Sequence, residues 1–232
     1  MAACRIVSSS VVLVTFALRA FAQGQISGRI VDHAGGPVVN GRVRLVPLTS
    51  GTLAPAGPSA ASQRHGNAVA GPGGGFSLTG IAPGLYRACA DLPGRELLDP
   101  CLWERTPVPV TVGDRPLSGI SVQLKRGATL SIRVDDAGKA LANAEKAGKG
   151  MLLVGVWSAN GVFHPARVTS EDSGGRTYSL EVPVGVTAKV TLTPSSLRLQ
   201  DTAGRALGAG GASTDVAMGP AGHALRYSVA AP

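Results

Sequence analysis

The cysteines are the residues whose chemistry is easiest to assign. Cys4 lies near the start of the chain, whereas Cys89 and Cys101 lie further along with eleven residues between them. Once a leader of 22 residues is cleaved, an even pair remains, and paired cysteines in an exported protein favour a disulfide. A metal-binding pair or a reactive thiol is the alternative, but eleven residues is not a metal-ligand spacing and no histidine lies nearby. We predict a structural disulfide between Cys89 and Cys101.

The histidines, serines and acids form no recognised catalytic pattern. None of the four histidines has a glutamate three residues later, and the sequence contains no G-x-S-x-G, phosphate-loop or dinucleotide motif. Glu96 and Asp99 could act as an acid and a base. The acid pairs Asp135-Asp136 and Glu171-Asp172 could hold calcium, but solvated turn acids are the simpler interpretation. The sequence therefore predicts no enzyme, no catalytic residue, no cofactor and no metal.

Two tryptophans could contact a ligand, because an exposed indole ring stacks on sugars or anchors a partner protein. Trp103 follows the second cysteine and either packs on the disulfide or faces outward. We take Trp103 as the candidate ligand or partner contact. Trp157 ends the apolar run Met151–Val156, so we expect it in a core.

The first 22 residues have the features of a secretory signal peptide. Arg5 provides a positive start, Val11–Leu18 is an apolar run, and Ala20–Ala22 is a small-x-small cleavage site before Gln23. The apolar run is shorter than the ~20 residues of a membrane-spanning helix. We predict export through this signal, a secreted or periplasmic mature chain, and no transmembrane segment.

The charge balance of the chain is modestly basic. Lys and Arg number 22 against 14 Asp and Glu, which gives a formal net charge of +8, and aromatic residues make up 4%. No block of five or six like charges occurs, and aromatic residues do not alternate with basic ones, so nucleic-acid binding is not indicated. The basic surplus fits plain solubility or a weak attraction to anionic envelope polymers.

Strands must position these side chains, because apolar and polar residues alternate along most of the chain. Period-two alternation is typical of strands with one face in a core and the other in solvent. Turn-forming residues separate the runs, and only Lys139–Lys149 could form one or two helical turns. The alternating runs are Ile26–Ile30, Val43–Leu45, Phe76–Leu78, Ile120–Leu124, Leu130–Val134, Tyr178–Val182, Ala188–Leu192 and Leu225–Val229. The prediction is an all-β chain of two consecutive antiparallel β-sandwich domains.

A domain boundary fits near Arg126-Gly127, where it divides the residues after the leader into similar halves, 23–126 and 127–232. The strand runs on either side of this point abut directly, which predicts rigid coupling. Two stretches, Leu48–Gly75 and Asp136–Gly150, lack strand periodicity and are expected as long loops.

Several motifs of the first half occur in the order of a known family. They are Gly28–Asp32 (GRIVD), Gly35–Val38 (GGPV), Gly41–Leu45 (GRVRL), Gly75–Leu78 (GFSL) and Ile81–Tyr86 (IAPGLY). With these motifs, residues 24–126 resemble the carboxypeptidase regulatory-like domain, whose pattern is G-x-V-x-D, G-x-P-V, A-x-V-x-L, G-x-F and L-P-P-G-x-Y. The resemblance implies that the first domain is a transthyretin-like, or prealbumin-like, β-sandwich that accompanies enzymes and does not catalyse.

The first half also departs from the family pattern at three places. Gly41 stands one place before the usual small residue, Ile81-Ala82 replaces Leu-Pro, and Gly74 stands where the family often has aspartate. The segment Cys89–Trp103 resembles a disulfide-bearing variant of such domains in exported bacterial proteins. Residues 127–232 have no assigned family.

Together these features predict a secreted or periplasmic, non-catalytic β-sandwich module that mediates protein interaction or envelope scaffolding. Its expected partner is another exported protein or a cell-envelope component. Two alternatives stay open. A carbohydrate-binding module would be favoured by an exposed Trp103 among polar residues, and a cryptic hydrolase has the weakest support.

Intact mass spectrometry of the exported protein tests the disulfide prediction. We expect a mass about 2 Da below that of the reduced form, because two thiol hydrogens are lost when the bridge forms. Two alkylatable thiols in the native protein would contradict the pairing of Cys89 with Cys101.

Overall fold

The computed structural model describes residues 24–48, 66–94, 96–105, 109–148, 151–195, 197–208 and 211–230. The predicted signal peptide lies outside these residues, as does most of the predicted loop Leu48–Gly75. In the described part of the chain, no helix has the length and apolar character needed to cross a membrane. The described residues are mostly strands, which confirms the predicted all-β class.

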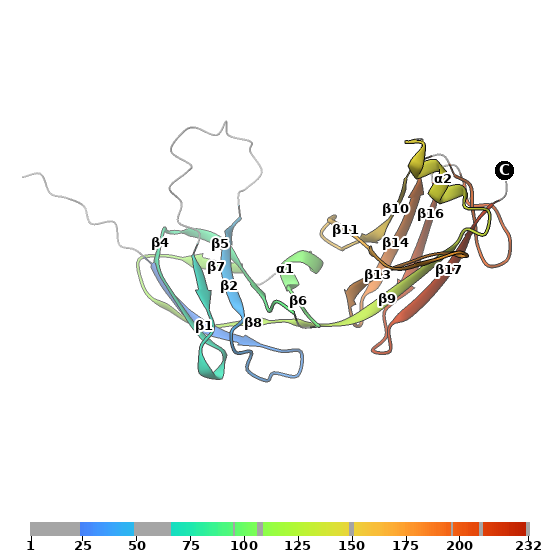
Figure 1. The fold of residues 1–232 in the computed structure, drawn as a ribbon. Helices are drawn as coiled ribbons and strands as arrows, with labels where there is room; N and C mark the ends of the chain where they lie inside the picture. The colour runs from blue at the N-terminus through green and yellow to red at the C-terminus, as the bar shows by residue number, and fades with distance from the viewer. Residues whose placement is uncertain are drawn as a thin grey trace, which may run out of the picture.

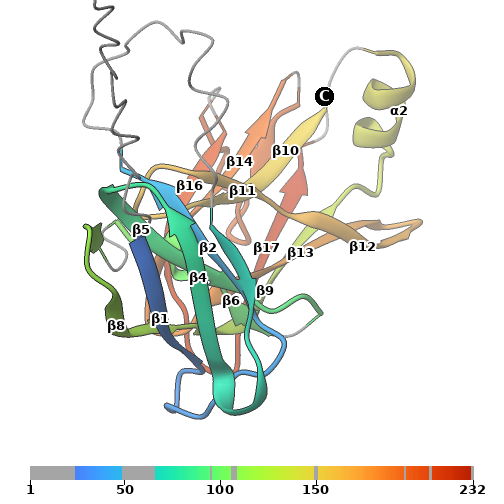
Figure 2. The same cartoon turned by 90° about the vertical axis from the view of Figure 1, so that its left-hand side faces the viewer.

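The first half of the chain forms a sandwich of two sheets, here called the first sandwich. Its sheets have the strand orders β4-β1-β8 and β3-β2-β5-β7. Figure 2 shows β4, β1 and β8 side by side. All neighbouring strands are antiparallel except β1 and β8, which run parallel. The strands are β1 (Gly24–Val31), β2 (Arg42–Pro47), β3 (Asn67–Val69), β4 (Gly75–Ile81), β5 (Gly84–Asp91), β7 (Pro109–Val112) and β8 (Leu117–Gln123).

The second half forms the second sandwich (Figure 1). One sheet has the order β11-β10-β14-β16, and the other has β12-β13-β9-β17-β15 with β6 (Leu97–Leu98) paired to β9. The strands are β9 (Lys125–Asp135), β10 (Leu152–Trp157), β11 (Phe163–Pro165), β12 (Arg167–Asp172), β13 (Gly175–Pro183), β14 (Thr187–Pro194), β15 (Leu199–Gln200), β16 (Ala212–Ala217) and β17 (His223–Val229).

The alternation seen in the sequence is what builds the two cores. In the first sandwich, Ile26 and Ile30 on β1 are fully buried and pack against Val43 and Leu45 on β2. Each of the eight alternating runs lies in a strand or extends one residue beyond it. Because alternate side chains point to opposite faces of a strand, one apolar set from each sheet fills the interior.

The two stretches predicted as loops contain regular structure. The described end of Leu48–Gly75 forms β3, which pairs with β2, and a short 3-10 turn over Pro72–Gly74. The loop prediction is wrong there, because β3 is too short for alternation to reveal it. Within Asp136–Gly150, the helix α2 (Ala140–Lys146) forms, as the helical alternative allowed.

The two sandwiches follow one another without a linker. β8 ends at Gln123 and β9 begins at Lys125, while Leu124 between them is fully buried in the first core. Ala128, on the same β9, packs in the second core. The chain thus enters the second sandwich on a continuous strand, and Figure 1 shows β9 extending from the centre of the molecule into it.

Gly28 on β1 lies where the parallel strands β1 and β8 pack closely. A Cβ atom at Gly28 would collide with the carbonyl oxygen of Ile120 on β8 and lie 2.8 Å from the ring of Phe76. We expect Gly28→Ala to lower the free energy of unfolding by about 1–3 kcal/mol, the usual cost of overpacking. Urea unfolding measures the change.

The matched control is Gly113→Ala in the same sandwich, where an added Cβ would meet no heavy atom within 4 Å. We expect little change for this variant. Equal stabilities for the Gly28→Ala and Gly113→Ala proteins would contradict the packing described for β1 and β8.

Candidate functional site

The predicted site residues Cys89, Cys101 and Trp103 meet where the two sandwiches join. Cys89 lies on β5, and Cys101 and Trp103 lie on the short helix α1 (Pro100–Trp103). Figure 1 shows α1 between the two sandwiches. We call residues 96–105 the joint segment, because contacts to both sandwiches come from it.

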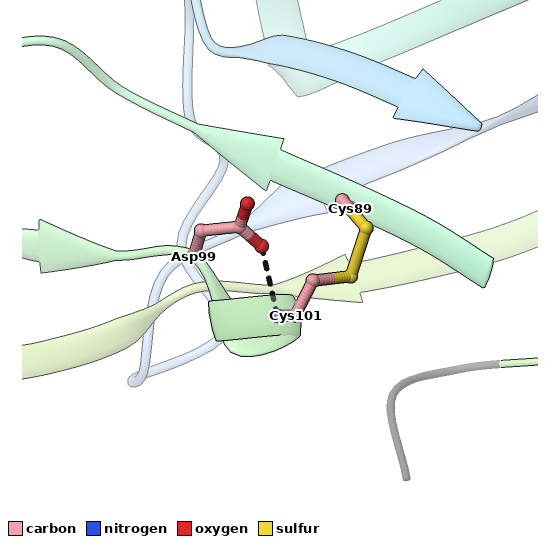
Figure 3. A group of neighbouring side chains, drawn as sticks. All are labelled: Cys89, Asp99 and Cys101. Atoms are coloured by element: carbon pink, nitrogen blue, oxygen red, sulfur yellow. Dashed lines mark hydrogen bonds between the residues drawn. A yellow bond between two sulfur atoms is a disulfide. The ribbon is translucent and has the colours of Figure 1, made fainter. Parts of the chain in front are cut away.

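The joint segment is bonded covalently to the first sandwich. Cys89 and Cys101 form a disulfide with a Cα–Cα distance of 5.5 Å, as the sequence predicts (Figure 3). Both cysteines are buried. A bridge that closes a loop of this size stabilises a fold by about 3 kcal/mol, chiefly by restricting the unfolded chain.

Asp99 adds a buried polar contact beside the disulfide. Its Oδ1 accepts a hydrogen bond of 2.8 Å from the backbone N–H of Cys101 and so caps α1, as Figure 3 shows. Its Oδ2 is paired with the guanidinium of Arg44 on β2. Burial raises the pKa of Asp99, whereas the Cys101 N–H and Arg44 act in the opposite direction. Since Glu96 is exposed and Asp99 is occupied in this way, the two do not form an acid–base pair.

Cys89, Asp99 and Cys101 also form the one group of potential metal ligands in the part of the chain that the structure describes. Both sulfur atoms are joined in the disulfide, so neither is available as a thiolate. Both carboxylate oxygens of Asp99 already accept hydrogen bonds. The oxidised site is therefore suited to fastening α1 and not to holding a metal.

Trp103 joins the segment to the second sandwich. Its side chain is 8% exposed and belongs to the second core, so it is a packing residue and not an exposed ligand or partner contact. The indole ring stacks on His164 of β11, with ring centroids 4.1 Å apart and planes 12° from parallel. His164 Nε2 donates a hydrogen bond of 3.1 Å to the carbonyl of Leu102. Burial lowers the pKa of His164.

Further polar contacts connect the joint segment to the turn between β10 and β11. Asn160 Nδ2 donates to the carbonyl of Cys101 at 2.9 Å, and Arg105 Nε donates to the carbonyl of Ala159 at 3.2 Å. On the strand that links the sandwiches, Lys125 forms an ion pair of 2.6 Å with Glu104. The joint segment is thus fastened on both sides.

Trp157 is placed differently from its prediction. It is 44% exposed, on the outer face of β10, with its ring 5.2 Å from that of Phe163. Val154 and Val156 face the core, so period-two counting from them indicates the outward position of Trp157. The unbroken apolar run before Trp157 hid this alternation.

The turn acids do not gather into a calcium site among the described residues. Asp135 is paired with Arg133 and Arg226, and Asp172 is paired with Arg133 at 2.7 Å. Hydrogen bonds from these arginines lower the pKa of Asp135 and Asp172. Asp136 accepts hydrogen bonds from the backbone N–H groups of Ala140 and Leu141, the first two residues of α2, which have no partner within the helix.

The Trp103–His164 stack predicts a pH dependence of stability. Because the folded pKa of His164 lies below its unfolded value of about 6.5, the unfolded chain binds a proton more readily as the pH falls below that value. We expect the melting temperature to fall between about pH 7.5 and pH 5.5, and to fall less in His164→Asn. Thermal unfolding of both proteins, monitored by circular dichroism, measures the difference. An identical pH dependence would contradict this role.

Comparisons with known proteins add weak structural likenesses. The sequence matches no protein-family description and no curated protein. One similar solved structure is the TIE protein of Bacillus anthracis, with 9% sequence identity and a TM-score of 0.32 over 90% of this chain and 34% of that one. A second is a streptococcal ancillary pilin, with 10% identity and a TM-score of 0.40 over 91% of this chain and 63% of that one. A third is GBS52, the minor pilin of Streptococcus agalactiae, with 13% identity and a TM-score of 0.39 over 90% of this chain and 97% of that one. This chain thus spans about a third of the first structure and 63% of the second. Likenesses of this degree leave its function to be argued from its own residues.

Proposed function

We propose that the chain is an exported, non-catalytic module that holds two β-sandwiches in a fixed orientation and binds or scaffolds another exported protein or a cell-envelope component. The observation that carries this proposal is the joint segment, which is covalently attached to the first sandwich and inserts Trp103 into the core of the second. The family resemblance of residues 24–126 supports a transthyretin-like, carboxypeptidase regulatory-like first domain in this proposal.

Fixed orientation matters because neighbouring domains in one chain usually move relative to each other unless a substantial apolar interface joins them. Here Leu97 packs on the first core and the next residue, Leu98, packs on the second. Backbone pairing of both leucines with β9 holds them in place. A preorganised pair of domains loses less conformational entropy when a partner binds across both, which suits a scaffold.

The disulfide supports the predicted compartment. Such bonds persist in oxidising environments outside the cytosol, and this one is buried within the joint. It agrees with the signal peptide expected from residues 1–22, and both support export to the periplasm or the exterior. Of the two alternatives, the carbohydrate-binding module is favoured by the exposed side chain of Trp157.

Capture from the native host's envelope fraction tests the proposal. Tagged protein spanning residues 23–232 serves as bait, and mass spectrometry identifies what is enriched. We expect an exported protein or envelope component to be retained by the wild type and weakly retained by a Cys89→Ala, Cys101→Ala double variant. The double variant removes the covalent attachment of α1, leaving the pairing of Asp99 with Arg44, and should let the two sandwiches move more. Small-angle X-ray scattering would record this movement as a broader range of dimensions.

The matched control is Gly28→Ala, which lowers stability without touching the joint segment and should keep its partner. Binding that survives in the double variant, or the absence of any enriched envelope component, would overturn the scaffold proposal. Circular dichroism ensures that every bait is folded at the temperature of the experiment.

A further inference from the structure

The outer face of the sheet β11-β10-β14-β16 carries a surface that the joint segment does not use. We call this surface the β10 platform. It consists of an apolar stripe along β10 and β11 and a polar stripe along β14 and β16. Its members are Leu153, Gly155, Trp157, Phe163, Lys189, Thr191, Thr193, Ser213 and Asp215.

The apolar stripe is partly exposed, and its two aromatic rings, Trp157 and Phe163, are tilted 56° to each other. Leu153 is 47% exposed and Trp157 is 44% exposed, two positions to either side of Gly155. The ring of Phe163 lies over Gly155, since a Cβ atom there would come 2.9 Å from Cε2 of Phe163. At about 3.4 Å per residue, the stripe from Leu153 to Trp157 extends roughly 14 Å along the strand. This length accommodates more than one sugar ring.

The polar stripe runs beside the apolar one in register. Across the β10–β14 pair, Trp157 lies opposite Lys189, Gly155 opposite Thr191, and Leu153 opposite Thr193. Opposed residues in a ladder point to the same face, so each apolar position has a hydrogen-bonding neighbour.

The second row of polar residues continues this stripe onto β16. Lys189 is opposite Asp215, and Thr191 is opposite Ser213. Lys189, Thr193, Ser213 and Asp215 are exposed, and Thr191 is half-buried. Their donors and acceptors face solvent, where a ligand can reach them.

The chemistry of the platform selects among ligands. A sugar ring presents apolar C–H groups on one face and hydroxyl groups around its edge, which match an aromatic surface bordered by hydroxyl, ammonium and carboxylate groups. The charge of Lys189 is balanced by that of Asp215 across the strand pair, so the face carries no excess charge for an anionic polymer. A protein partner would have to present a matching row of donors and acceptors, because polar groups that lose water without gaining a partner cost free energy.

We propose that the β10 platform binds an extended, uncharged polysaccharide. Sugar rings stack on Trp157 and Phe163, and their hydroxyl groups hydrogen-bond to Lys189, Thr191 and Thr193. This inference goes beyond the proposed scaffold function, because it rests on the outer face of one sheet and not on the joint. The turn after Trp157 contacts the joint segment through Ala159 and Asn160, so a bound glycan would be held in a fixed position relative to the first sandwich.

Affinity electrophoresis of the protein spanning residues 23–232 tests the inference. The gels contain hydroxyethylcellulose, laminarin or galactomannan as uncharged probes, or alginate as an anionic one, and pull-downs use insoluble cellulose and chitin. We expect at least one uncharged polysaccharide to bind, and Trp157→Ala to weaken that binding about tenfold or more. Because Trp157 lies on the outer face of β10 and not in the core, the variant should remain folded, which its melting temperature checks.

The matched control is Val168→Ala, at a side chain that is 48% exposed on β12, in the other sheet of the same sandwich. This variant should bind the polysaccharide as the wild type does. Absence of binding to every uncharged probe, binding to alginate alone, or equal binding by Trp157→Ala would overturn the inference. Light scattering provides a further check. If the wild type is a dimer and the Trp157→Ala protein is a monomer, the face binds a second copy of the chain and the inference is overturned.

The two proposals can fail separately. Polysaccharide binding by the platform depends on Trp157 and should survive in the Cys89→Ala, Cys101→Ala protein, whereas scaffolding depends on the joint. Loss of envelope capture in the cysteine variant together with retained polysaccharide binding would support both. Loss of both activities in the cysteine variant would contradict the independence of the platform from the joint.

Discussion

The attachment of α1 to the first sandwich is the constraint on which the arrangement of the two sandwiches depends. A helix of four residues has no stability of its own, because its few hydrogen bonds do not offset the entropy of nucleation. The disulfide from Cys89 and the pairing of Asp99 with Arg44 hold it against the outer face of β2 and β5. Only a helix held in this way can present Trp103 to the second core.

Trp103 connects α1, which is attached to the first sandwich, to the core of the second sandwich. Its ring completes the edge of the second core and covers His164, while the backbone around it receives hydrogen bonds from the turn after β10. Together with the continuous passage from β8 into β9, this makes two independent connections between the sandwiches. Two separated connections restrict rotation in a way that a single strand would not.

The strand β10 serves both sides of its sheet. Val154 and Val156 contribute to the core, and the alternate positions form the apolar stripe of the platform. Gly155 has a specific role. Because it has no side chain, the ring of Phe163 can pack directly on the backbone of β10 beside Trp157. Because the core positions Val154 and Val156 fix where β10 lies, they also fix the positions of the exposed side chains between them.

The amino-acid sequence by itself determined eight of the strands, the alternating apolar residues that they contribute to the cores, and the pairing of Cys89 with Cys101, because alternation and cysteine count are local or countable properties. It did not determine which tryptophan is exposed. The burial of Trp103 depends on His164, and the role of Asp99 depends on Arg44, residues far away in the chain that only folding brings close. Such contacts leave no periodic trace in the sequence, since they arise between elements that meet at a domain joint and not along one strand.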